Sequence, residues 1–162
     1  MREEMRRAKY LSIPAAYRRA AVQPSRSRGD LSTSVISEVW DRLIEVYGSF
    51  VAWSSAYADE NVDYLDEPTQ RREQVTQRLS ELSDYYFPRA VWLDHRTCRS
   101  VEQFIEESEG LYLEFADEIK KRGYSRRVRV GMAERVSAEL GPLKREAVAY
   151  LRDELKHSGN QQ

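Results

Sequence analysis

Apolar residues between Ser32 and Leu65 recur at spacings of three, four and seven, the pattern of one face of an α-helix. One row of this stripe consists of Ile36, Leu43, Phe50, Tyr57 and Tyr64, and a second consists of Val39, Val46 and Trp53, widened by Trp40 and Tyr47. So broad an aromatic face is typical of the inside of a helical bundle rather than of a two-stranded coiled coil. We expect a helix of roughly 50 Å over 32–65, capped by Asp30, Ser32 or Thr33.

Two further helices are predicted downstream. The second opens after Asp66 and Glu67 with Pro68 in its first turn, and Phe87-Pro88 ends it. The third opens with a capping box of Ser100 and Gln103 and ends at Gly123, and Ser108 interrupts its apolar face. Their inward residues are Val75, Leu79, Leu82 and Tyr86 in the second, and Val101, Phe104, Leu111, Phe115 and Ile119 in the third. The apolar run 90–93 between them is interpreted as a plug over an open end of the bundle.

The last helix is predicted to begin near Ser125 and to meet a kink or a break at Gly141-Pro142, because proline lacks an amide and clashes with the preceding turn. Its inward residues are Val128, Met132, Val136, Leu140, Leu143, Ala147, either Tyr150 or Leu151, and Leu155. The predicted fold class is all-α: a largely antiparallel four-helix bundle of long helical hairpins with a basic N-terminal arm.

Charge divides the 162 residues unevenly, although their net charge is only −1. Residues 1–29 hold eight Lys or Arg against two Glu, whereas the remainder holds eighteen against twenty-five acidic residues. Residues 23–30 have the composition of a linker. We therefore expect a flexible basic arm over 1–29, a bundle domain over 30–158 and a disordered tail over 159–162.

Cys98 is the single cysteine, so no intrachain disulfide can form and a reducing, cytoplasmic location is expected. The longest stretch without charged side chains, 46–58, has thirteen residues, which is too short to cross a bilayer. The N-terminus has positive charges with no apolar core behind them, so we expect no secretory signal and no membrane partner.

A long aromatic helix, a charged second helix, the Val91-Trp92-Leu93 segment and the closing 142–155 stretch occur together in this chain. In this combination, residues 33–157 resemble an uncharacterised family of bacterial all-helical proteins. The resemblance implies a helical-hairpin bundle and no catalytic residue.

Metal and catalytic sites are not predicted. His95 and Cys98 have the spacing of metal ligands, but a zinc site needs three or four ligands. Glu154 and His157 match the Glu-x-x-His spacing of di-iron bundles, which need a second such pair. No Gly-rich phosphate loop and no nucleophile beside an oxyanion loop occur, so we expect no enzyme and no cofactor.

One cluster of cations is the candidate binding site. Six cations and one aromatic residue surround Gly123, namely Lys120, Lys121, Arg122, Tyr124, Arg126, Arg127 and Arg129. Arginine forks at the start of a helix suit phosphate or carboxylate groups, and the tyrosine adds a stacking face. The alternative is that Lys120, Lys121 and Arg122 complement the negative end of their helix while the arginines are simply solvated.

The leading hypothesis is a non-catalytic interaction module that binds a protein partner or a second copy of itself. It rests on ten tyrosines and three tryptophans, since such residues anchor interfaces. The alternative is an accessory protein that binds nucleic acid or phosphate through the basic arm and the 120–129 turn.

Overall fold

The computed structural model describes residues 28–55 and 67–159, which contain helices and no strand. Its elements are α2 (Arg28–Ser54), α3 (Glu67–Tyr86), η2 (Phe87–Trp92), α4 (His95–Arg122), α5 (Arg126–Arg135), η3 (Val136–Leu140) and α6 (Gly141–Gly159). Here η2 is a 3₁₀-helix and η3 is a π-helical turn.

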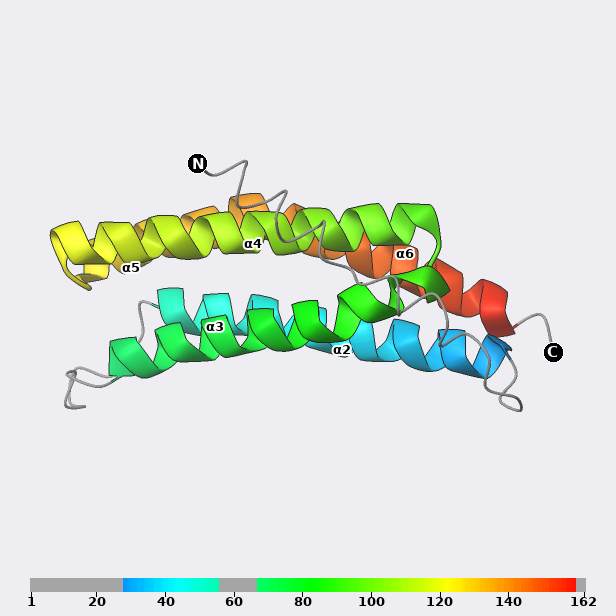
Figure 1. Cartoon of the computed structure of the whole chain (residues 1–162). Helices are drawn as coiled ribbons and strands as arrows, with labels where there is room; N and C mark the ends of the chain where they lie inside the picture. The colour runs from blue at the N-terminus through cyan, green and yellow to red at the C-terminus, as the bar shows by residue number, and fades with distance from the viewer. Residues whose placement is uncertain (1–27, 56–66, 160–162) are drawn as a thin grey trace, which may run out of the picture.

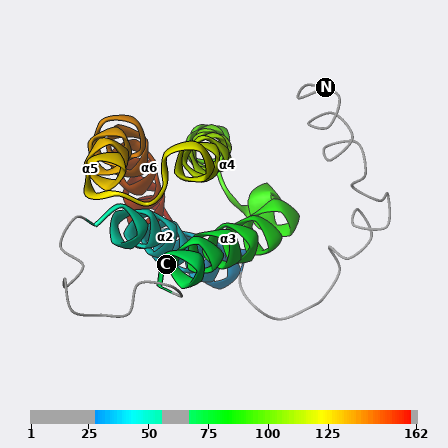
Figure 2. The same ribbon diagram turned by 90° about the vertical axis from the view of Figure 1, so that its left-hand side faces the viewer.

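The helices run alternately up and down the long axis of the molecule (Figure 1). Seen along that axis, α2 and α3 form one layer, and α4 and the continuous α5–η3–α6 rod form the other (Figure 2). The prediction of an all-α, largely antiparallel four-helix arrangement is confirmed for the described residues.

The core is built around α2. Its buried residues are Val35, Ile36, Val39, Leu43, Val46, Phe50 and Trp53, with Trp40 and Tyr47 half-buried at the edge. Both predicted rows are therefore correct as far as Trp53, and Tyr57 and Tyr64 lie outside the described residues. The apolar faces predicted for the other helices are buried too, except that Ile119, Leu143, Tyr150 and Leu155 are only partly covered.

The predicted ends of the first helix are wrong at both sides. It begins at Arg28, inside the segment interpreted as a linker, so Asp30, Ser32 and Thr33 lie within the helix and do not cap it. It ends at Ser54, and Ser55 has left the helical conformation. The 27 residues therefore span about 40 Å. Of the predicted arm, 1–27 lie outside the described residues, and Gly159 of the predicted tail still belongs to α6.

The capping box of Ser100 and Gln103 is also wrong. The cap is six residues earlier, at Asp94, whose carboxylate accepts the Thr97 amide at 2.8 Å. Ser100 is buried inside this helix. An aspartate in extended backbone is as good a cap as serine, and the apolar spacing does not distinguish the two positions. At the other end, Gly123 closes α4 with a φ of 74°, as predicted.

The segment interpreted as a plug covers the core only in part. Leu93 is buried and Trp92 is half-buried, whereas Val91 is 79% exposed. Residues of a 3₁₀-helix point in three directions, so one of them faces away from the bundle.

Pro142 neither breaks the helix nor ends it. A π-helical turn precedes it, in which the Gly141 amide reaches the Val136 carbonyl, five residues back. An α-helical turn would bring the proline ring against the carbonyl of residue 138. We attribute the π-helical turn to this conflict, because its wider ring makes room for the proline while the chain stays helical.

The first prediction tests the core. Phe50 is fully buried, and its ring packs on Trp53 and Phe115 at centroid distances of 6.3 and 6.4 Å. Phe50→Ala should lower the free energy of unfolding by about 3–5 kcal/mol, as measured by urea denaturation. A loss below about 1 kcal/mol would contradict the burial of this ring.

Candidate interaction site at the carboxyl end of α2

The last turn of a helix leaves carbonyl groups without partners inside the helix, and α2 has no basic residue in its last turn. Side chains from other elements supply the donors. Arg71 of α3 donates to the Ala52 carbonyl at 2.8 Å, and Arg129 of α5 donates to the Ser55 carbonyl at 3.2 Å. Tyr124 donates its hydroxyl hydrogen to the Trp53 carbonyl. Two guanidinium groups therefore also face the negative end of the helix dipole.

This arrangement divides the predicted cation cluster. The ring of Tyr124 lies under the Arg129 guanidinium, with 5.3 Å from its Cζ to the ring centroid, and both residues hold α2. Tyr124 is consequently not an open stacking face, and Arg129 has a structural partner. The sequence does not show this, since the two carbonyls are more than 70 residues away along the chain.

The other cations of the cluster lie on the surface. Lys121 pairs with Asp117 and Arg122 pairs with Glu118 within the last turns of α4, and all of these side chains are largely exposed except that of Glu118, which is partly buried. Such pairs contribute little to stability. Lys120, Arg126 and Arg127 are exposed, and within 28–55 and 67–159 no ion pair is found for any of them. Of the seven predicted site residues, therefore, only Lys120, Arg126 and Arg127 are exposed cations that form no ion pair with a described residue.

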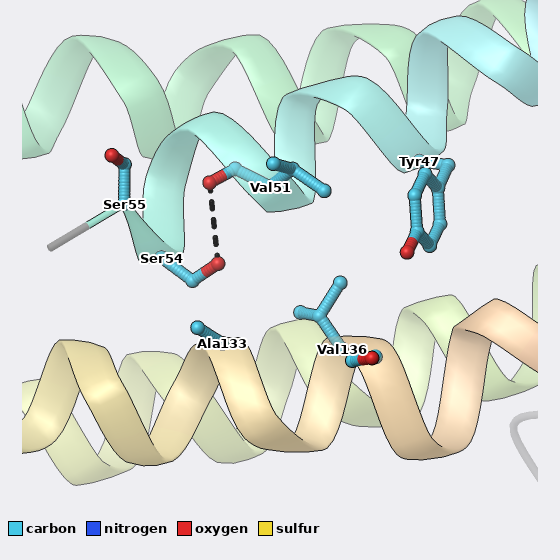
Figure 3. Close-up of a pocket in the computed structure, with 7 residues that line it drawn as sticks. Tyr47, Val51, Ser54, Ser55, Ala133 and Val136 are labelled. Carbon is cyan, nitrogen blue, oxygen red and sulfur yellow. Dashed lines mark hydrogen bonds between the residues drawn. The ribbon is translucent and has the colours of Figure 1, made fainter. Parts of the chain in front are cut away.

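A shallow groove of about 330 Å³ lies beside this cluster, between α2 and the α5–η3 segment (Figure 3). It is lined by Tyr47, Val51, Ser54, Ser55, Ala133, Val136 and Ser137. None of these side chains carries a charge. The Ser54 hydroxyl donates to its own helix, at 2.9 Å from the Phe50 carbonyl and 3.2 Å from the Val51 carbonyl. The groove is therefore mainly apolar in chemical character.

Three exposed apolar residues lie in the groove or close to it in the sequence of the same helices. Val51 is 46% exposed, and Ile44 on the same helix is 41% exposed. Val130, which is 40% exposed, lies one turn before Ala133 on α5. At the η3 end, the Lys144 ammonium lies 4.2 Å from the centroid of the Tyr47 ring, which adds one charge at the rim. A partner in the groove would meet apolar walls with cations at the edges.

The pairs with metal-ligand spacing do not form sites. The Cys98 thiol donates to the Ala90 carbonyl at 3.3 Å, and burial raises its pKa, so it is a poor nucleophile and ligand. Glu154 accepts the Asp94 amide at 2.9 Å, and His157 contacts the Asp153 carbonyl through Nδ1. In the described part of the chain, no three His, Cys, Asp or Glu side chains gather closely enough to hold a metal ion.

One carboxylate cluster lies between α4 and the α5–η3 segment. Arg135 pairs with Glu114 at 2.8 Å and with Glu139 at 2.7 Å, and its guanidinium covers the Phe115 ring. Burial and the neighbouring Glu139 carboxylate raise the pKa of Glu107. Arg135 lowers the pKa of Glu139. These residues do not line the groove, so we assign them to helix packing.

Comparisons with known proteins give no relative. No family model matches the chain, and no curated protein or solved structure matches it. The resemblance to bacterial all-helical proteins stays a prediction. None of the described helices is long and apolar enough to cross a membrane.

Sequence reasoning missed the groove. A signal for it exists in the run 46–58, which has no charged side chain although Gly48, Val51 and Ala52 fall outside the core stripe. The helix pattern shows that these positions are not in the core, but the side of α2 on which α5 packs is known only from the structure.

The second prediction concerns the cap on α2. Tyr124→Phe removes the hydroxyl that donates to the Trp53 carbonyl and keeps the ring, so it should lower the free energy of unfolding by about 0.5–1.5 kcal/mol. Tyr150→Phe is the matched control, because Tyr150 is half-buried and its hydroxyl bonds to no described residue. Equal stability of the two variants in urea denaturation would contradict the assigned role of Tyr124.

Proposed function

We propose that this protein is a non-catalytic interaction module that binds a protein partner through the α2–α5 groove and the exposed face of α2 beside it. One observation carries the proposal. In a chain with 33% charged residues, the groove is lined by uncharged side chains, and the apolar residues Val51, Ile44 and Val130 in or beside it are each about two-fifths exposed. Apolar patches bordered by charges are typical of interaction sites.

The size of the patch supports a modest affinity. Val51, Ile44 and Val130 are each about two-fifths exposed, and full burial of such a side chain is worth about 1.5–3 kcal/mol relative to full exposure. Completing their burial therefore contributes roughly a few kcal/mol before the cost of association is subtracted. A net binding free energy of this size is typical of a partner that binds reversibly.

The groove has the wrong composition for catalysis. Its hydroxyl groups belong to Tyr47 and three serines, and among the described residues no histidine, carboxylate or amine lines it as a base. We also place the protein in a reducing compartment such as the cytoplasm, since Cys98 is the single cysteine of the chain.

The third prediction tests this surface. A photo-crosslinking benzoylphenylalanine at position 51, in the full chain and in its native host, should give covalent adducts with protein. The same residue at position 91 or 113 is the control, because Val91 and Leu113 are exposed apolar residues outside the groove. Adducts at none of these positions, or equally at all three, would overturn the proposal.

A second candidate function is sequence-independent binding of nucleic acid. The observation that favours it is the exposure of Lys120, Arg126 and Arg127, which are unpaired by described residues near one end of the bundle. Arg126 and Arg127 also stand at the start of α5, where cations oppose the helix dipole and an anion would relieve them.

The fourth prediction tests this candidate. Arg126→Glu with Arg127→Glu should abolish retention on a DNA or RNA column while leaving stability nearly unchanged, and the retention of the unmodified chain should fall steeply with salt. Arg129 is not changed, because it bonds to the Ser55 carbonyl. If the unmodified chain is not retained at about 50 mM salt, nucleic-acid binding is excluded, since phosphate contacts are strongest at low salt.

A further inference from the structure

The outer face of α2 carries a narrow stripe of small and apolar residues. Ile44, Gly48, Val51 and Ala52 are all exposed and lie four, three and one residues apart, which places them on one side of the helix. A Cβ atom built on Gly48 would meet no atom within 4 Å, so the surface is open at this point. Glycine there lets another backbone approach closely.

The two ends of the stripe have opposite charges. Asp41 is exposed one turn before Ile44, and no described residue forms an ion pair with it. At the other end, the Arg129 guanidinium binds the Ser55 carbonyl. Arg126 lies one turn before Arg129 on α5 and is exposed. The face therefore has the unpaired Asp41 carboxylate at one end and the cations of α5 at the other, and the charge of Glu45 between them is paired with Arg78.

We propose that the partner of this surface is a second copy of the chain, bound with the two α2 helices antiparallel and crossing at Gly48. The inference rests on the proposed function and names its partner.

The spacing of residues along α2 determines which residues of the two copies face each other. Asp41, Gly48 and Ser55 are seven residues apart, so they lie nearly in line along α2, each about 10 Å from the next. A two-fold axis at Gly48 therefore places Asp41 of one copy against Ser55 of the other, which is bonded to Arg129 and lies about one turn of α5 from Arg126. The same axis brings Ile44 close to Ala52, and every contact occurs twice.

Charge complementarity favours a second copy of the chain bound in the antiparallel orientation. A parallel pair of α2 helices would put Asp41 beside Asp41 and Arg126 beside Arg126, whereas the antiparallel pair joins opposite charges twice. Glu45 is also exposed at this face, but it is already paired with Arg78 of α3 at 3.2 Å and needs no partner from the second copy.

The fifth prediction is the oligomeric state of the full chain. Sedimentation equilibrium should show a reversible monomer–dimer equilibrium whose dimer weakens as salt is raised. Gly48→Arg should raise the dissociation constant at least tenfold, because it places a long charged side chain at the crossing point. This variant should fold, since arginine favours a helix more than glycine and the Cβ meets open space. Leu113→Arg, at a site 57% exposed on α4, is the matched control and should leave dimerisation unchanged.

Charge reversal tests the antiparallel register. Asp41→Arg and Arg126→Asp should each raise the dissociation constant at low salt by roughly tenfold, because each reversal acts at two symmetric contacts. The double variant should return to within about threefold of the unmodified chain, since it restores opposite charges. A dimer in which the double variant is as weak as either single variant would overturn the register.

Other results of these experiments distinguish a failure of the dimer inference from a failure of the proposed function. A chain that stays monomeric up to millimolar concentration overturns the second copy as partner. If position 51 then crosslinks to a different protein, the interaction module stands and this inference fails. An adduct of twice the mass of the chain, absent in the Gly48→Arg variant, supports both.

Discussion

The carboxyl end of α2 is the point on which the arrangement of the four helices depends. Its ring cluster joins two layers, since Trp53 lies 5.7 Å from Tyr112 and 5.9 Å from Phe115 of α4, measured between ring centroids. Its carbonyls draw donors from α3, from the turn after α4 and from α5. The bonds to the Trp53 and Ser55 carbonyls are partly buried, where an unpaired carbonyl is costly, so these donors and the rings position each other.

The need for donors at the carboxyl end of α2 determines which surface remains available to bind a partner. The turn at Gly123 must bring Tyr124 and Arg129 to α2, and this removes two of the seven candidate residues from solvent-facing roles. The same contact brings α5 alongside α2, where small side chains such as Ala133 leave a groove. The structural use of the cations and the existence of the groove therefore have one cause.

Gly48 is a residue of α2 whose identity the fold of one copy does not explain. Glycine inside a helix costs about 1 kcal/mol relative to alanine, and the fold does not require it, because a larger side chain would meet open space. The proposed crossing of two α2 helices supplies a reason for glycine at this position, since it would set how closely the backbones approach. The opposite charges at Asp41 and Arg126 would then determine the relative orientation of the two α2 helices more than the affinity of the dimer, as exposed charges generally do.

The sequence by itself determined which residues are buried and where several helices end. A repeat of three and four marks a buried face wherever the helix packs, and Gly123 and Pro68 mark a helix end and start through their own backbone preferences. Tertiary structure decided the rest. The division of the cation cluster and the groove depend on which helices lie side by side. Those contacts join residues far apart in the chain, and spacing along one helix carries no information about them.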